Sequence, residues 1–75
     1  MYVLYDTFND RIVSRHRKLV AACKANERFQ RQIKKNNGAN SYIPVDLRIL
    51  HKDGRLEKLE EGSPDQAFWL TYPHY

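Results

Sequence analysis

Positively charged side chains recur along residues 17–35 at intervals that place them on one side of an α-helix. They are spaced seven, four, three and four residues apart, and they project within about 60° of one another. The five residues are Arg17, Lys24, Arg28, Arg31 and Lys35. Such a stripe could follow a phosphate backbone. A solvated helix face also carries long cations but usually mixes in Glu, and the one nearby acid, Glu27, lies off the stripe. The bias toward one sign favours binding, and both interpretations stay open at this point.

A second group of cations, Arg15-His16-Arg17-Lys18, precedes the expected helix. Free backbone amides at a helix N-terminus attract anions, so this run could contribute to a phosphate site. The alternative is that the run lies mostly outside the helix, where cations cost little against the helix dipole. We favour this alternative for the helix terminus, and keep Arg15, Arg17 and Lys18 among the candidate polyanion-binding residues.

The C-terminal segment, residues 68–75, is rich in aromatic side chains. A small domain needs its aromatic residues to fill its core, so we expect Phe68 and Trp69 to be buried. Tyr72 and Tyr75 are candidate exposed contacts to a partner.

The residue types of acid–base, nucleophilic or metal chemistry are present but scattered. Three histidines, His16, His51 and His74, lie on three different segments, and no catalytic or phosphate-loop motif accompanies them. A small ribonuclease is therefore a distant third interpretation. The single cysteine, Cys23, lies on an apolar helix face, where a thiol is typically an inert part of the core. We predict no enzyme activity, no metal site and no cofactor.

The element that must position the cation stripe is a central helix. Apolar residues recur at helical spacing on the opposite side of the stripe, at Leu19, Ala22, Cys23, Phe29 and Ile33. Asn37-Gly38 is a helix stop, and we place the helix at 17–37, starting near Arg17. Asn26 lies in the middle of the apolar side and, if buried, needs hydrogen-bond partners.

Strand patterns flank this helix on both sides. Residues 1–14 predict one β-hairpin and residues 42–60 a second, in which Asp53-Gly54 is a two-residue type I′ turn that sets Leu50 opposite Glu57. Leu56 and Leu59 cannot share one face of a regular strand, so either a bulge intervenes or the strand ends early. Residues 63–75 form an aromatic tail, a short helix begun by Ser63-Pro64 or a short strand. The predicted fold is α+β, ββαββ, with one central helix on a small antiparallel sheet.

Size and charge bound the function. Seventy-five residues make a single compact domain with a thin core. One cysteine allows no internal disulfide, and no signal peptide or membrane-spanning run of about 20 apolar residues is recognisable, so we expect a cytoplasmic protein. A net charge of +4 favours DNA, RNA or an acidic protein as partner. We therefore predict a small non-enzymatic module that binds nucleic acid or another polyanion through the basic helix face. The alternative is a protein-interaction or homodimerising module that uses a sheet edge and the aromatic tail.

Overall fold

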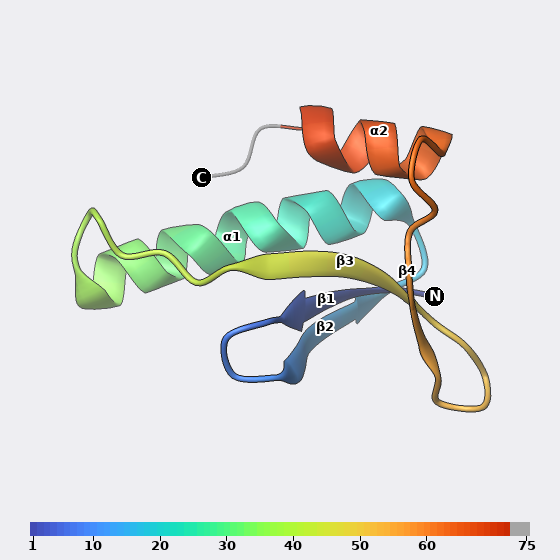
Figure 1. The fold of residues 1–75 in the computed structure, drawn as a ribbon. Helices are drawn as coiled ribbons and strands as arrows, with labels where there is room; N and C mark the ends of the chain where they lie inside the picture. Colours follow the sequence, from blue (N-terminus) through green and yellow to red (C-terminus); the bar gives the residue numbers. More distant parts are fainter. Residues whose placement is uncertain (73–75) are drawn as a thin grey trace.

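The computed structural model describes residues 1–72, which form a four-stranded antiparallel sheet with two helices on one of its faces (Figure 1). The elements along the chain are β1 (Tyr2–Asp6), β2 (Arg11–His16), α1 (Leu19–Asn37), β3 (Val45–Leu50), β4 (Leu56–Lys58) and α2 (Pro64–Thr71). The strand order in the sheet is β2-β1-β3-β4, so β2 and β4 are the edges. The predicted ββαββ arrangement is confirmed, and the tail is a helix rather than a strand.

The register of the central strands fixes which side chains face α1. Leu4 lies opposite Leu47 in the β1–β3 pair, and both are fully or almost fully buried in one cluster with residues of α1. Because side chains alternate along a strand, Val3 and Arg48, which pair one position away, face the other side of the sheet. In the edge strand β2 the register shifts, and Val13 is left without a partner on β1.

The core is filled mainly by side chains of the sheet and of α2. Leu4, Leu47 and Trp69 are its large members, whereas α1 contributes small side chains: Ala22, Cys23 and Ala25.

Three larger apolar residues of the predicted helix face, Leu19, Phe29 and Ile33, are only half-buried. A 19-residue helix is about 28 Å long, whereas strands of five or six residues span about 17–20 Å, so α1 extends past the sheet it covers. The buried length of the apolar face is correspondingly short.

Two buried amide side chains of α1, Asn26 and Gln30, form hydrogen bonds, and those of Gln30 join the helix to the segment before β3. Gln30 Nε2 donates to the carbonyl oxygen of Ile43 at 2.7 Å, and Gln30 Oε1 accepts from the Ile43 N–H at 3.3 Å. Gln30 Nε2 also lies 3.3 Å from Asn26 Oδ1, so the expectation that a buried Asn26 needs a partner is confirmed. Gln30 thus pairs with a backbone residue as a neighbouring strand would, and it ties the segment before β3 to the helix. We call this arrangement the Gln30 clasp.

The β3–β4 hairpin differs from the predicted one by one residue in register. Leu50 lies opposite Leu56, not opposite Glu57. A shift of one residue moves each side chain of a strand to the opposite face. The strand ends at Lys58, so the early end is the correct one of the two alternatives for Leu56 and Leu59.

The turn of this hairpin explains the shift. A type I′ turn needs positive φ at both central residues, but of Asp53 and Gly54 only Gly54 has it, at 88°. The His51 N–H donates to the Arg55 carbonyl at 2.9 Å, and the Gly54 N–H donates to the His51 carbonyl at 3.0 Å. The loop therefore has three residues, with glycine at the last position.

The helix boundaries follow local capping. α1 begins at Leu19, two residues later than predicted, because Lys18 is still extended and no side chain caps the helix. Gly38 ends it with a φ of 109°, and its N–H donates to the Lys34 carbonyl. At the start of α2, Ser63 Oγ accepts from the Gln66 N–H at 3.2 Å, as the sequence predicted.

α2 is held to the sheet by one polar contact and one large apolar side chain. The Tyr2 hydroxyl donates to Asp65 Oδ2 at 2.6 Å, and this hydrogen bond, with burial and the carboxylate charge, raises the pKa of Tyr2. Trp69 reaches the core with 8% of its surface exposed, as expected. Phe68 was expected to be buried too, but it is 38% exposed, because its neighbour in the helix takes the inward position.

The β1–β2 turn is organised by a buried carboxylate. Asp6 Oδ1 accepts from the N–H groups of Phe8 and Asn9 at 2.9 and 3.0 Å, and Asp6 Oδ2 accepts from Asn9 Nδ2 at 2.8 Å. The Arg11 guanidinium lies 3.6 Å away. Burial by itself would raise the pKa of Asp6, but the hydrogen bonds from Asn9 and Phe8 and the charge of Arg11 outweigh it, and the net pKa is lowered.

We expect Trp69→Ala to cost about 3–5 kcal/mol of the free energy of unfolding, because it removes the largest core side chain. The matched variant Phe68→Ala, one residue away in the same helix, should cost about 1 kcal/mol, since that ring is partly in water. Urea unfolding followed by circular dichroism measures both. Equal losses in the two variants would show that α2 is rotated from the position described here.

We expect Asp6→Asn to destabilise the protein at neutral pH by about 1–3 kcal/mol, because hydrogen bonds to a charged acceptor are lost. A carboxyl with a lowered folded-state pKa stabilises above its unfolded pKa, and this stabilisation disappears as pH falls through the folded value. The difference between wild type and variant should therefore shrink below about pH 4. Urea unfolding across this range is the measurement, and the exposed Asp10→Asn in the same turn is the control. A difference that does not change with pH would contradict the role of the Asp6 charge.

Candidate polyanion-binding face

The charges of the chain are segregated along its sequence. Residues 15–37 hold eight of the thirteen basic residues but only one of the nine acidic ones, a net charge of +7. The remaining residues together carry a net charge of −3. The net charge of +4 therefore understates the charge on α1 and the residues that lead into it.

The predicted stripe holds on the helix itself. All five of its cations are exposed, and four of them, Lys24, Arg28, Arg31 and Lys35, lie within α1 on the side away from its buried residues. Arg17 is exposed but precedes the helix, as does Lys18. These two residues extend the positive charge beyond the N-terminal end of α1, and they are not part of its face.

Arg15 was assigned to the same group, and the structure separates it from the others. Arg15 lies opposite Val3 in the β1–β2 pair. Val3 faces away from α1, and directly paired residues of an antiparallel pair share a face, so Arg15 belongs to the other side of the sheet. Sequence reasoning placed it before the helix without knowing where the strand alternation would direct it.

The single acid of α1 pairs with one of the stripe cations. Glu27 Oε1 and Arg31 Nη2 form an ion pair at i and i+4, the favourable helical spacing. The sequence placed Glu27 off the stripe, but its side chain reaches Arg31. Lys24, Arg28 and Lys35 therefore carry most of the uncompensated charge of the face.

The edge strand β2 packs beside α1 and ends at His16. His16 lies opposite Tyr2, whose side chain reaches α2 on the helix-covered side of the sheet, so His16 faces the same side. His16 Nε2 is 2.7 Å from Ser14 Oγ. Burial lowers the pKa of His16, and the positive charge of Arg28 lowers it further. Sequence reasoning considered His16 only with its neighbours in the chain and missed its pairing with Ser14, two residues earlier on the same strand face.

Of the two tail residues proposed as partner contacts, the structure describes only Tyr72, and that residue is less exposed than expected. Tyr72 is half-buried and packs against the core, with its ring centroid 5.8 Å from that of Phe68. Tyr75 lies outside the described residues. The exposed apolar surface of α2 is instead provided by Leu70, which is 68% exposed, and by part of Phe68.

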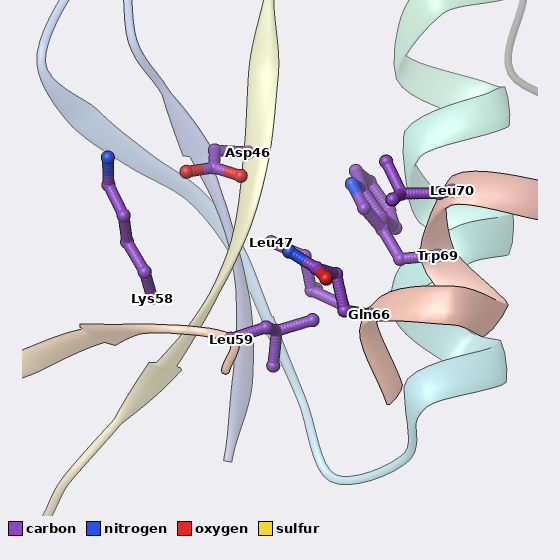
Figure 2. Close-up of a pocket in the computed structure, with 7 residues that line it drawn as sticks. All are labelled: Asp46, Leu47, Lys58, Leu59, Gln66, Trp69 and Leu70. Atoms are coloured by element: carbon purple, nitrogen blue, oxygen red, sulfur yellow. The ribbon is translucent and has the colours of Figure 1, made fainter. Parts of the chain in front are cut away.

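An open pocket of about 220 Å³ lies between α2 and the β3–β4 edge of the sheet (Figure 2). Trp69, Leu70 and Leu59 supply apolar walls, and the ends of Asp46 and Lys58 stand apart on its strand side. This is the opposite edge of the sheet from β2, so the pocket and the cation stripe are separate features. The pocket combines an apolar interior with polar groups at its margin, as ligand-binding pockets usually do.

The histidines of the described residues lie apart, and no metal-binding group is found among residues 1–72. His16 lies on β2 and His51 follows β3, where it contacts Glu57 at 2.9 Å, so these two histidines are on different parts of the sheet, and His74 is outside residues 1–72. Within that range no group of three or more His, Cys, Asp or Glu side chains could hold a metal ion. Neither helix in residues 1–72 is long and apolar enough to cross a membrane.

Comparison with known proteins yields no relative: no family model, curated protein or solved structure matches this chain. Its function is therefore inferred from the charges, burial and hydrogen bonds of its own residues.

Cys23 is fully buried on the inner side of α1, and burial raises the pKa of its thiol. Because the thiolate is the reactive form, we expect Ellman's reagent to label the native protein slowly and the denatured protein rapidly. Rapid labelling of native protein would mean that the helix opens easily or that its buried face has been assigned incorrectly.

Proposed function

We propose that this protein binds nucleic acid through the outer face of α1, by contacts to phosphate groups. One observation carries the proposal: residues 15–37 have a net charge of +7, and four exposed cations follow one side of the helix. Lys24 and Lys35, the two ends of this row, are about 16 Å apart along the helix axis at 1.5 Å per residue. Double-stranded DNA carries one charge per about 1.7 Å of its axis, so a row of this length can face several phosphates.

The contacts expected from this face are electrostatic and independent of base sequence. Long, flexible cations on a convex helix surface reach backbone phosphates, and each contact releases condensed counterions. The stripe consists of Arg and Lys alone, the residues that most often bond backbone phosphates, and such contacts carry no sequence information. We therefore infer a module that recognises the charge density of a polyanion.

The distribution of charge also favours a defined orientation on the ligand. The net charge of −3 outside residues 15–37 is repelled by the polyanion that the helix face attracts. Complementary fields of this kind steer diffusional encounters and raise association rates.

A second candidate function, a protein-interaction module, is favoured by α2. Leu70 is 68% exposed beside the pocket that Trp69 and Leu59 line. An exposed aliphatic side chain at the margin of an apolar pocket is a common feature of contact surfaces between proteins. This surface and the cation stripe could serve two partners at once, since the pocket lies between α2 and the β3–β4 edge of the sheet, whereas the stripe lies on the outer side of α1.

We expect the affinity for a short labelled DNA duplex to fall with salt, with a log–log slope of about −2 to −4, as a few phosphate contacts predict. The double variant Lys24→Gln with Lys35→Gln should weaken binding and flatten the slope by about two, at about one per lysine. The matched control is Lys52→Gln with Lys58→Gln, which removes the same charge from the β3–β4 hairpin. It should leave the slope almost unchanged. Fluorescence anisotropy at several salt concentrations measures all three proteins.

Two outcomes would contradict the proposal. If the parent protein does not bind DNA or RNA at low salt, the nucleic-acid function is wrong. If the two double variants weaken binding equally, the protein responds to total charge, and α1 is not the binding face.

A further inference from the structure

We propose that Ser14, His16 and Arg28 form a phosphodiester-binding site at the seam between β2 and α1, and that His16 takes up a proton when the phosphate binds. This inference rests on the proposed nucleic-acid function and names the contact within the basic face that responds to pH.

The sheet register brings the two β2 side chains to the seam. Ser14 lies opposite Leu4, which is buried beneath α1, and His16 lies opposite Tyr2. Both side chains therefore face the helix side of the sheet, and they do so on its edge strand, where no further strand covers them. Both are half-buried, so each retains a surface that a ligand can reach.

The hydrogen bond between these residues prepares donors for an anion. His16 Nε2 and Ser14 Oγ are 2.7 Å apart. In the protonated ring both nitrogens carry hydrogen, so Nε2–H must donate to Ser14 Oγ and the serine hydroxyl hydrogen turns elsewhere. The serine hydroxyl can then donate to a phosphate oxygen, which the positive charge of the ring also attracts. The Arg28 guanidinium adds its own N–H donors, in a fork suited to phosphate.

The charged groups around His16 set the coupling between proton and ligand. Burial lowers the pKa of His16, and from α1 the charge of Arg28 lowers it further, so both favour the neutral ring. From β1, the facing titratable group is Tyr2, whose hydroxyl is already bonded to Asp65 of α2. The neighbours of His16 in the chain are also cations. Arg15, on the same strand, faces the other side of the sheet, and Arg17 and Lys18, which follow the strand, are exposed.

Burial and the charge of Arg28 are what lower the pKa of His16, so an anion that binds beside both residues would offset that charge. A phosphodiester between Arg28 and the ring cancels part of the repulsion, and the protonated ring becomes the favoured form. By linkage, a ligand that raises the pKa of His16 must bind more tightly as pH falls through the titration of that residue. A phosphodiester is itself fully ionised over this range, so a change in affinity reports on the protein.

The test is the pH dependence of affinity for a labelled DNA duplex without terminal phosphates, measured at fixed salt. For the parent protein we expect affinity to rise as pH falls from about 8 to about 6, by up to about tenfold per pH unit, the limit for one linked proton. His16→Gln keeps a neutral hydrogen-bonding side chain and should give an affinity that no longer changes with pH over this range. His51→Gln, which changes the histidine beside Glu57 and away from the seam, should keep the dependence of the parent. Ser14→Ala should weaken binding across the whole range.

A second measurement observes the protonation of His16 directly in the parent protein. The imidazole signals of the parent protein are followed by NMR against pH, with and without saturating duplex, and the His16 signal is identified by its loss in His16→Gln. We expect the His16 titration to move to higher pH on binding. If duplex binds with the expected salt dependence but His16 does not shift, and His16→Gln keeps the pH dependence, this site is wrong and the nucleic-acid function stands. If no duplex binds at low salt, both are wrong.

Discussion

The packing of small side chains of α1 against two leucines of the sheet is the contact on which the rest of the structure depends. Ala22, Cys23 and Ala25 let the helix approach closely to the buried pair of Leu4 and Leu47. Small side chains give close approach but bury little apolar area, and each large buried side chain contributes only about 1.5–3 kcal/mol. The helix–sheet contact is therefore incomplete by itself, and Trp69 of α2 supplies the missing volume.

The same constraint explains why amides take part in the interior of α1. Asn26 and Gln30 occupy positions where a larger apolar face would continue, and they satisfy one another and the backbone of Ile43. No buried side-chain nitrogen or oxygen among the described residues lacks a hydrogen-bond partner. The buried residues of α1 are small or carry amide groups, and they form a narrow strip along the helix. Most of the helix surface is therefore exposed. That surface is where the cations lie, so the packing of the core and the proposed binding face are two consequences of one helix sequence.

The sequence predicted the features that depend on local chemistry. The order of elements, the helix stop at Gly38 and the Ser63 cap all follow from residues a few positions apart. The cation stripe was also correct on α1, because helical spacing alone determines which side of a helix a residue takes. Gln30 could have been found in the same way, since it lies one turn beyond Asn26 on the same side.

The errors all concern features that depend on partners distant in sequence or on a single-residue choice. A two-residue and a three-residue turn both suit Asp53-Gly54, and choosing the wrong one reversed the faces of β4. Arg15 was misplaced because strand alternation, set by pairing with β1, decides its side. Phe68 and Trp69 are adjacent and both aromatic, and only the direction from which α2 meets the core determines which one is buried. The proposed site at His16 would combine a strand residue with a helix residue twelve positions later, a pairing that no spacing rule in the chain specifies.

The Gln30 clasp has a consequence for the route by which the chain folds. β1 and β3 are neighbours in the sheet, but Asp6 pairs with Val45, so their pairing must close a long loop. Closing a loop costs entropy that grows with its length, and sheets made of distant strands fold slowly for this reason. The clasp joins residues only thirteen apart and needs only α1 as its platform. Once it forms, β3 is held beside the helix. To pair with β1, β3 then has only to reach the correct orientation, and the full length of the intervening chain no longer has to be closed as one loop. A hydrogen bond that contributes modestly to the finished structure can thus lower the entropic barrier to reaching it.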